Sequence, residues 1–320
     1  MSYNHLTSLE RDQLYVLREI DKLSISKIAE EMNRSQSTIS RELRRNSFAD
    51  KLYLPDKAQQ MVESRRKESK EKFGSVGEIT IVHIKQHLEQ YHSPEQLCGR
   101  MKLEGLDSVS YETIYQMIYA DHQGLGKYKK YLRQKQKKRR RKGNKQKRGV
   151  IPGRVGIENR PPIADLKTEI GHWEGDTVIG ANHQGVIVTY VDKASKYLLA
   201  GLVKNKTVEQ VNQLTMKLFA DVKQSFRTTI TFDNGREFCG HQEISTKLGL
   251  DIFFANPYHS WERGLNEHTN GLIRQFVPKG KSFNIKMAEE FQKYVELINH
   301  RPRKSLDYRT PYEVFFSVPV

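Results

Sequence analysis

The sequence predicts a multidomain chain in which all-α modules precede an α/β domain. In the N-terminal third, apolar residues recur at helical spacing in short segments that follow serine caps. A basic run and a cluster of prolines and glycines come next, and beyond them short β-rich runs alternate with amphipathic helices. The length of 320 residues permits two or three such domains.

The composition is that of a soluble globular protein, with 29% charged and 37% hydrophobic residues. No apolar run approaches the roughly 18 residues of a membrane span, and Met1–Asp12 lacks the apolar core of a signal peptide. We therefore expect a cytoplasmic protein. Cys98 and Cys239 fall in different predicted domains, which favours reduced thiols and no disulfide.

The net charge of +16 predicts a polyanionic partner. Between Lys127 and Arg148, 14 of 22 residues are Lys or Arg and none is acidic, so the rest of the chain carries only +2. This run is either a solvated linker or a flexible tract that binds phosphates, and the two interpretations are compatible. Its consecutive arginines are the expected DNA contacts within the run: Arg139, Arg140 and Arg141.

The first module, residues 1–46, shows three helical patterns. Ile25, Ile28, Ala29 and Met32 form the apolar stripe of the second, and Ser35 offers an N-cap for the third. The outer face of the third helix carries hydrogen-bonding and basic side chains, which predicts a DNA-reading helix-turn-helix rather than a plain three-helix bundle. The expected DNA contacts on it are Gln36, Ser37, Thr38, Ser40, Arg41 and Arg44.

A polar helix that begins near Pro55 is expected to connect this module, across residues 47–77, to a second trihelical pattern at 78–124. Ser93 and Ser110 are its predicted caps. The third helix carries tyrosines four residues apart, which fit either a DNA face or a packing stripe. DNA contact, a structural role and dimerisation therefore all remain open for this module.

A basic linker, residues 125–165, leads to an α/β domain at 166–320. Three β-rich runs with turn residues between them predict an antiparallel meander at 172–180, 185–192 and 196–203. An alternation of helices and strands follows. The expected elements are a helix from Thr207, a strand at Ile230, a helix at 242–248, a strand at 252–255, a helix that ends at Phe276 and a last helix at 288–298.

The helix that ends at Phe276 carries the first chemical signal. Glu267, Gly271 and Arg274 are spaced i, i+4, i+7 and share one face, with Asn270 beside them. A carboxylate and a guanidinium on one face could hold a metal ion and a phosphate together.

Two strands supply further carboxylates, Asp176 and Asp233. Carboxylates from three separate elements can hold the two divalent ions, roughly 4 Å apart, that phosphodiester chemistry uses. Glu174 lies two residues before Asp176 on the same strand face, so either acid could be the ligand. A zinc site is the alternative for the nearby histidines: His172, His241, His259 and His268.

Two strand aspartates followed by a helical glutamate, with 33 residues between Asp233 and Glu267, resemble the DDE transposases and retroviral-type integrases of the RNase H-like fold. Four sequence motifs resemble the insertion-sequence-30 family of bacterial transposases in particular: H-W-E-G-D, D-N-G-R-E-F, S-W-E-R-G-x-N-E-x-T-N-G-L-I-R-Q-F and N-H-R-P-R-K-S-L. The resemblance implies helix-turn-helix N-terminal modules and an α/β RNase H-like catalytic domain. Only Leu265 and His268 depart from the family pattern beside Glu267.

The same resemblance implies that Asp176, Asp233 and Glu267 are catalytic metal ligands and that Arg274 holds a phosphate. The expected cofactor is Mg²⁺, with Mn²⁺ as a possible substitute, at two ions per active site. The implied function is a transposase that binds the inverted-repeat ends of an insertion sequence, cleaves a strand and joins it to target DNA. Its partners would be double-stranded DNA and further copies of the chain, at the nucleoid. A DNA-binding regulator without turnover and a structure-selective nuclease are the alternatives.

Overall fold

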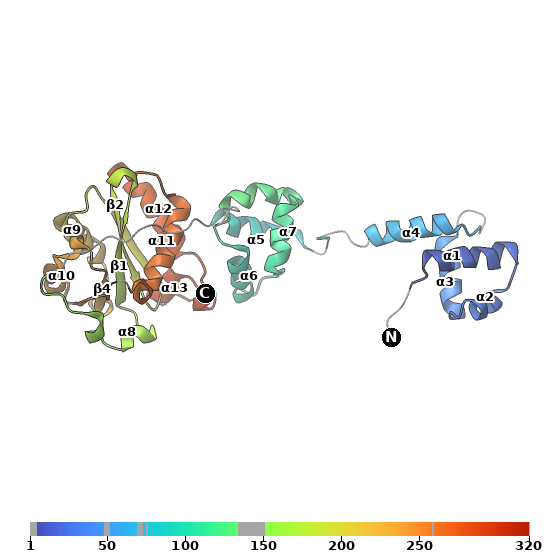
Figure 1. Cartoon of the computed structure of the whole chain (residues 1–320), viewed down its shortest axis with the longest axis horizontal. Coiled ribbons are helices and arrows are strands. Elements are labelled where there is room, and N and C mark those ends of the chain that lie inside the picture. Colours follow the sequence, from blue (N-terminus) through green and yellow to red (C-terminus); the bar gives the residue numbers. More distant parts are fainter. Residues whose placement is uncertain are drawn as a thin grey trace. The chain divides into compact units, whose positions relative to one another are not determined.

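The structure, a computed structural model, describes residues 5–47, 52–68, 73–74, 76–133, 151–257 and 259–319. It divides into two compact units, residues 1–75 and 76–320 (Figure 1). Arg139, Arg140 and Arg141 lie outside the described residues. Within those ranges, no helix has the length and apolar character to cross a membrane.

The first unit is helical. Leu14, Ile28 and Ile39 come from three helices and are fully buried against one another. The Ser35 hydroxyl accepts a hydrogen bond from the Thr38 amide and caps the third helix, as predicted. The helices are α1 (Ser8–Tyr15, extended by a π-turn at Val16–Ile20), α2 (Ile25–Glu31), α3 (Gln36–Asn46) and α4 (Pro55–Glu68).

Helix α4, expected as a connector, also belongs to the core of the first unit. Tyr53, just before it, and Ala58, within it, are fully buried. The Tyr53 hydroxyl donates to Glu42 on α3, and Glu42 also pairs with buried Arg11 on α1 at 2.7 Å. Burial and the Glu42 carboxylate raise the pKa of Tyr53. These polar contacts tie α1, α3 and the start of α4 together.

The second unit begins with the second trihelical pattern, α5 (Glu78–Glu89), α6 (Pro94–Leu103) and α7 (Tyr111–Tyr119). Ser93 and Ser110 cap α6 and α7 as predicted. Tyr111 and Tyr119 are 52% and 53% exposed, so the tyrosine stripe of α7 does not form the core of this module. The core comes from the opposite faces of the three helices: Ile84, Leu88, Leu97, Met101, Ile114 and Met117.

The described residues of the α/β domain contain a five-stranded sheet in the order β3-β2-β1-β4-β5. As predicted, β1, β2 and β3 form an antiparallel meander, and β4 and β5 extend the sheet parallel to β1. The strands are β1 (His172–Ile179), β2 (Val186–Asp192), β3 (Leu198–Val203), β4 (Thr229–Phe232) and β5 (Asp251–Phe254).

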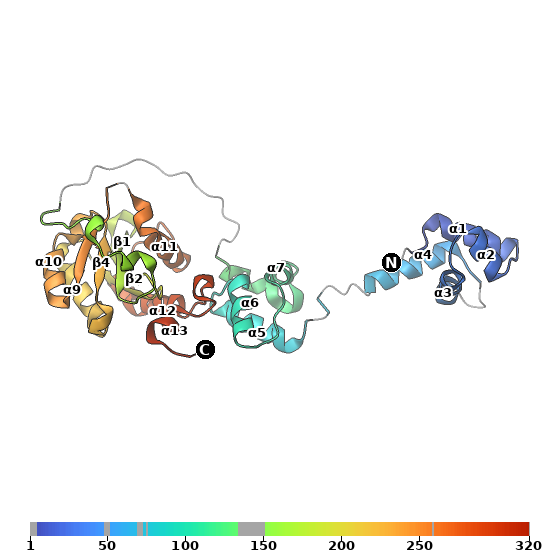
Figure 2. The same cartoon turned by 90° about the horizontal axis from the view of Figure 1, so that it is seen from below.

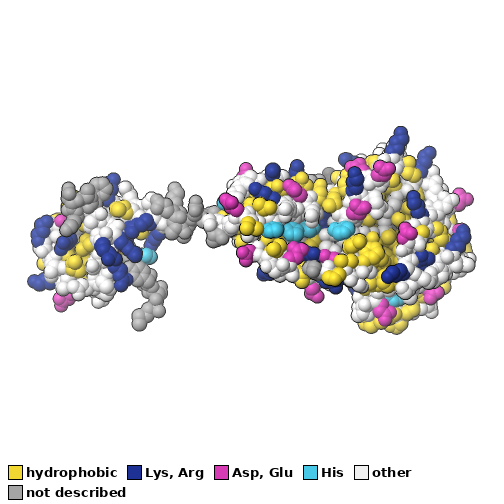
Figure 3. Space-filling model, turned by 180° about the vertical axis from the view of Figure 1, so that it is seen from behind, with side chains coloured by type: hydrophobic (Ala, Val, Ile, Leu, Met, Phe, Trp, Pro, Cys, Tyr) yellow, Lys and Arg dark blue, Asp and Glu magenta, His cyan; other side chains and the backbone are white. Residues whose placement is uncertain are grey.

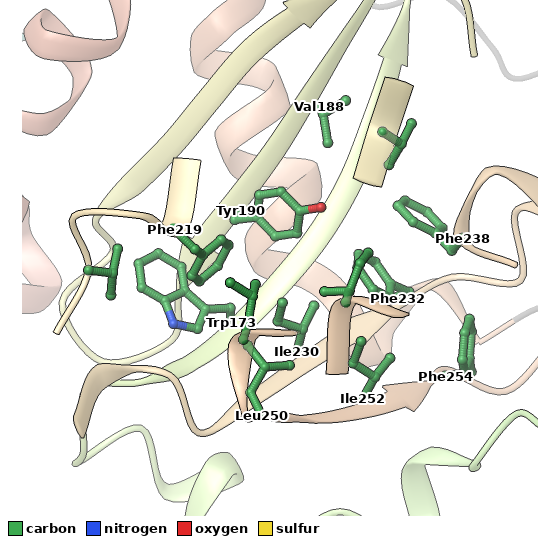
Figure 4. Close-up of a cluster of buried hydrophobic side chains, with 14 of the residues drawn as sticks. Trp173, Val188, Tyr190, Phe219, Ile230, Phe232, Phe238, Leu250, Ile252 and Phe254 are labelled. Atoms are coloured by element: carbon green, nitrogen blue, oxygen red, sulfur yellow. The ribbon is translucent and has the colours of Figure 1, made fainter. Parts of the chain in front are cut away.

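Helices cover both faces of this sheet (Figures 1 and 2). On one face, α9 (Val208–Phe219) and α10 (His241–Leu248) enclose an aromatic cluster around Trp173, Tyr190 and Phe232 (Figure 4). On the other face, α11 (Gly264–Phe276) and α12 (Ala288–Asn299) pack on Ile187 and Val191. The short helices α8 (Ile163–Leu166) and α13 (Pro311–Phe316) complete the domain. This architecture agrees with the predicted fold class, all-α modules followed by an α/β domain.

Within the second unit, the α5–α7 module docks directly on the α/β domain. Arg100 on α6 pairs with Glu313 on α13 at 2.7 Å, and Gln275 on α11 donates to the Tyr131 carbonyl at 2.9 Å. A Cβ at Gly99 would lie 2.2 Å from the Tyr308 ring, so the close approach of α6 requires glycine there.

Candidate active site and nucleic-acid surface

The register of β1 and β4 brings two of the predicted acids together. Glu174 is aligned with Thr231 in this parallel pair, so Asp176, two residues further on, is level with Asp233 just past the end of β4. Arg263 lies between them, with its guanidinium nitrogens 3.5 Å from an Asp176 oxygen and 3.6 Å from an Asp233 oxygen. One cation therefore bridges the two carboxylates.

Helix α11 runs along β1 at this place and contacts it at successive turns. The Asn266 amide donates to Glu174 at 3.1 Å, and the Asn270 side chain donates to Asp176 at 2.7 Å. Asn270 contacts Asp176, as does Arg263 in the turn before the helix, and Glu267 lies one turn before Asn270 on the same face of the helix. The face predicted to carry the chemistry is thus turned toward β1.

The electrostatics of Asp176 reflect this crowding. Burial raises the pKa of the Asp176 carboxyl, and the neighbouring Asp233 raises it further, while Arg263 and the Asn270 hydrogen bond oppose both effects. A cation at this position is therefore favourable.

The expected cage of three carboxylates is not assembled in this structure. Among the described residues, no group of three or more His, Cys, Asp or Glu side chains is close enough to hold a metal ion. Glu267 is exposed, and Arg263 supplies the positive charge between Asp176 and Asp233. The donor set still fits a hard divalent cation, because Asp176 and Asp233 present carboxylate oxygens to a shared positive charge.

Glu174, the alternative ligand, has a different environment. It is buried, and its carboxylate accepts the Asn266 amide in the first turn of α11, where backbone N–H groups have no partner within the helix. Burial raises its pKa, and this hydrogen bond opposes the shift. Glu174 therefore caps α11 across the domain and fixes the start of that helix relative to β1.

Arg274 is not placed at the aspartates. Its guanidinium donates to the Ile179 carbonyl at 3.2 Å and lies 5.5 Å from the centre of the Phe283 ring. The predicted face therefore extends from Asn270 at Asp176 to Arg274 at the end of β1.

The four histidines considered for zinc have separate environments. His172 hydrogen-bonds to Thr229, His241 to the Gly153 carbonyl and His259 to Glu262. His268 lies on the flank of α11 that faces three arginines. The described histidines thus give no support to the zinc interpretation.

Comparison with known proteins decides the family. A helix-turn-helix domain matches residues 2–46, and an integrase core domain matches residues 167–260, which include Asp176 and Asp233. The chain is 40% identical over 312 residues to the transposase for insertion sequence element IS4351 of Bacteroides fragilis, covering 97% of this chain and 95% of that protein. The chain belongs to the insertion-sequence-30 family of transposases.

Two further relatives are also transposases of insertion sequences. The transposase for IS1086 of Cupriavidus metallidurans is 35% identical and matches 99% of this chain and 95% of its own length. The transposase InsI for IS30A of Escherichia coli is 31% identical and matches 97% of this chain and 83% of its own length. This transposase is therefore a DNA-binding enzyme of the DDE type that cleaves and transfers DNA strands. Its integrase core implies dependence on a divalent metal.

The transposase exposes the predicted DNA-reading face of α3. Thr38 is half-buried, and its backbone amide and hydroxyl both hydrogen-bond to the Ser35 side chain that caps the helix. Figure 3 shows Lys and Arg side chains gathered on the small first unit, at the left of the view. The exposed members of the predicted set are Gln36, Ser37, Ser40, Arg41 and Arg44.

Sequence reasoning missed Arg263. It lies at the end of the 3-10 turn Ser260–Arg263 with a non-helical backbone, φ −129° and ψ 42°, so helical periodicity does not place its side chain at the aspartates.

Proposed function

We propose that Asp176, Asp233 and Glu267 are the catalytic carboxylates of this transposase and ligate two Mg²⁺ ions, which Mn²⁺ can replace. The observation that carries the proposal is the pairing of Asp176 with Asp233 across β1 and β4, beside the α11 face that bears Glu267. Divalent ions supply activation of the attacking oxygen and stabilisation of the leaving oxygen in phosphodiester cleavage and transfer.

The other residues prepare this site. Asn270 orients Asp176 through its hydrogen bond, and Glu174 fixes the start of α11. Arg263 compensates the charge of both aspartates, so its side chain must move away when a metal ion binds there. Arg274, further along the same face, holds a phosphate of the DNA.

DNA recognition uses two parts of the chain in this proposal. The α3 side chains Gln36, Ser37, Thr38, Ser40, Arg41 and Arg44 read the inverted-repeat ends. Arg139, Arg140 and Arg141 bind phosphates without reading sequence. The active assembly is a homodimer or larger oligomer that pairs two ends at the nucleoid in the cytoplasm.

The test is Asp233→Asn assayed on a duplex that contains an element end. Cleavage should fall by at least a thousandfold, while end binding measured by footprinting stays unchanged, because the α3 face is untouched. Asp251→Asn, at an exposed position on β5, is the matched control and should keep both. Loss of end binding by Asp233→Asn, or normal cleavage, would contradict the assignment. If the wild-type chain fails to nick DNA with Mg²⁺, a regulator is favoured, and cutting without joining favours a nuclease.

A further inference from the structure

Two arginines that follow α12 are buried and pair with no carboxylate in the described part of the chain. Arg301 and Arg303 are 2% and 8% exposed. One nitrogen of Arg301 donates to the Gln275 side chain at 3.0 Å, and one of Arg303 donates to the Ile298 carbonyl at 2.9 Å. Nε and Nη2 of Arg301 and Nε and Nη1 of Arg303 are buried and have no hydrogen-bond partner among the described residues. Burying guanidinium donors without acceptors costs free energy, and an anion bound at this pair would supply the acceptors.

Two further basic side chains lie beside this pair. Arg133 approaches α11 so closely that its Nη2 would lie 3.1 Å from a Cβ at Gly271. His268, one turn earlier on α11, lies close to Arg133, Arg301 and Arg303 and lines the same cavity as Arg303. Burial and neighbouring positive charge lower the pKa of Arg303 to about 9 and that of Arg301 to about 10. We call these four residues the arginine cluster.

No acidic side chain balances the arginine cluster in the part of the chain that the structure describes: none of its four members forms an ion pair there. Residues 134–150, which follow Arg133 directly, contain no Asp or Glu in the sequence. The three arginines remain close despite their mutual repulsion, which points to a negative partner that the described residues do not supply.

A cavity gives a ligand access to Arg303. Its volume is about 1050 Å³, and Arg303 and His268 are among its lining residues. Three of its four acidic lining residues already have donors: Asp165 pairs with Lys193 at 3.0 Å and with Arg160, and Glu174 and Glu262 accept backbone amides. Nε and Nη1 of Arg303 have no acceptor among the described residues, so an anion in the cavity is drawn toward Arg303. The volume is ample for a phosphate group.

We propose that the arginine cluster binds one backbone phosphate of the DNA on which the active site acts. Guanidinium forks match the geometry of phosphate oxygens. The position also fits, because His268 is about 100° around α11 from Glu267, so the cluster flanks the catalytic face. Arg133 follows the α5–α7 module in the chain, so the bound phosphate would also hold this module against α11. The inference rests on the proposed function of the active site.

The experiment is ethylation interference on an element-end duplex without metal, with Arg303→Met and Arg301→Met as test variants. Ethylation of one discrete phosphate should weaken binding by the wild type but not binding by either variant. The salt dependence of binding should fall in both variants by about one phosphate contact. Lys293→Met, an exposed cation on α12, is the matched control and should behave as wild type. Arg303→Lys keeps the charge and should restore part of the interference.

The outcomes separate this inference from the proposed function. Asp233→Asn should lose cleavage and keep the interference, whereas Arg303→Met should lose the interference at that phosphate and keep the α3 footprint. The anion could be a DNA phosphate or free inorganic phosphate. Thermal unfolding in inorganic phosphate, compared with chloride at the same ionic strength, separates these two sources. Stabilisation of wild type by free phosphate without any change in DNA interference would overturn the DNA assignment in favour of a free-anion site. An unchanged interference pattern and no phosphate-dependent shift would overturn the inference altogether. If Arg303→Met does not fold, Arg301→Met and Arg303→Lys decide.

Discussion

Arg263→Met tests whether the guanidinium between the aspartates stands where a metal binds. The substitution keeps a long side chain but removes the charge shared by Asp176 and Asp233 and the donor to the Gly175 carbonyl, which it reaches at 2.9 Å. The loss of this hydrogen bond and of charge compensation at a mostly buried pair should lower the free energy of unfolding by about 2 kcal/mol without metal.

Divalent metal should offset this loss. If Arg263 competes with the ion, the variant binds Mg²⁺ more tightly, and each tenfold gain in affinity adds about 1.4 kcal/mol of stabilisation at saturating metal. Urea denaturation of wild type and variant, with and without Mg²⁺, measures the difference, and calorimetric titration measures the affinity. Arg227→Met is the matched control, because Arg227 donates to the backbone carbonyls of Val222 and Ala220 and contacts no carboxylate among the described residues. Equal destabilisation with and without Mg²⁺ would refute the reasoning.

Three further predictions concern other parts of the molecule. Burial, His87 and neighbouring arginines hold the pKa of His92 well below 6.5, so the unfolded chain takes up the proton first. Stability should therefore fall as pH drops below about 6.5, by at most roughly 1.4 kcal/mol per pH unit, and His92→Gln should flatten this slope in denaturation curves. Glu42→Gln should lower the free energy of unfolding of the first unit by about 3 kcal/mol, because it leaves buried Arg11 without its charge partner; a change below about 0.5 kcal/mol would contradict this. Arg44→Ala should weaken end binding measured by gel shift and reduce its salt dependence, with cleavage per bound complex unchanged.

Local chemistry explains why much of the fold could be predicted. Serine and threonine caps define where helices begin, and Ser35, Ser93, Ser110 and Thr207 are all found as caps. Helix α11 occupies Gly264–Phe276 and ends before Pro278, as the sequence indicates. Short β-rich runs separated by turn residues likewise predicted the meander, since a strand covered by helices on both faces needs apolar residues at most positions.

The contacts that the sequence did not reveal join residues far apart in the chain. Glu174 caps a helix through Asn266, 92 residues later, and nothing near Glu174 signals that role. Arg263 reaches both aspartates only because the turn before α11 lies beside the middle of β1 and the end of β4. Arg301 and Arg303 look like ordinary basic residues of a positively charged chain, and their burial depends on how the loop after α12 packs. Helical and strand periodicities carry no such information.

The most direct test of the central claim is a crystal structure of the transposase with Mn²⁺, in which anomalous scattering locates the ions. The proposed catalytic assignment predicts Mn²⁺ peaks within about 2.3 Å of Asp176 and Asp233 oxygens, with Glu267 turned in as the third ligand and Arg263 displaced. Manganese bound elsewhere, or aspartates still bridged by Arg263 at saturating Mn²⁺, would contradict it.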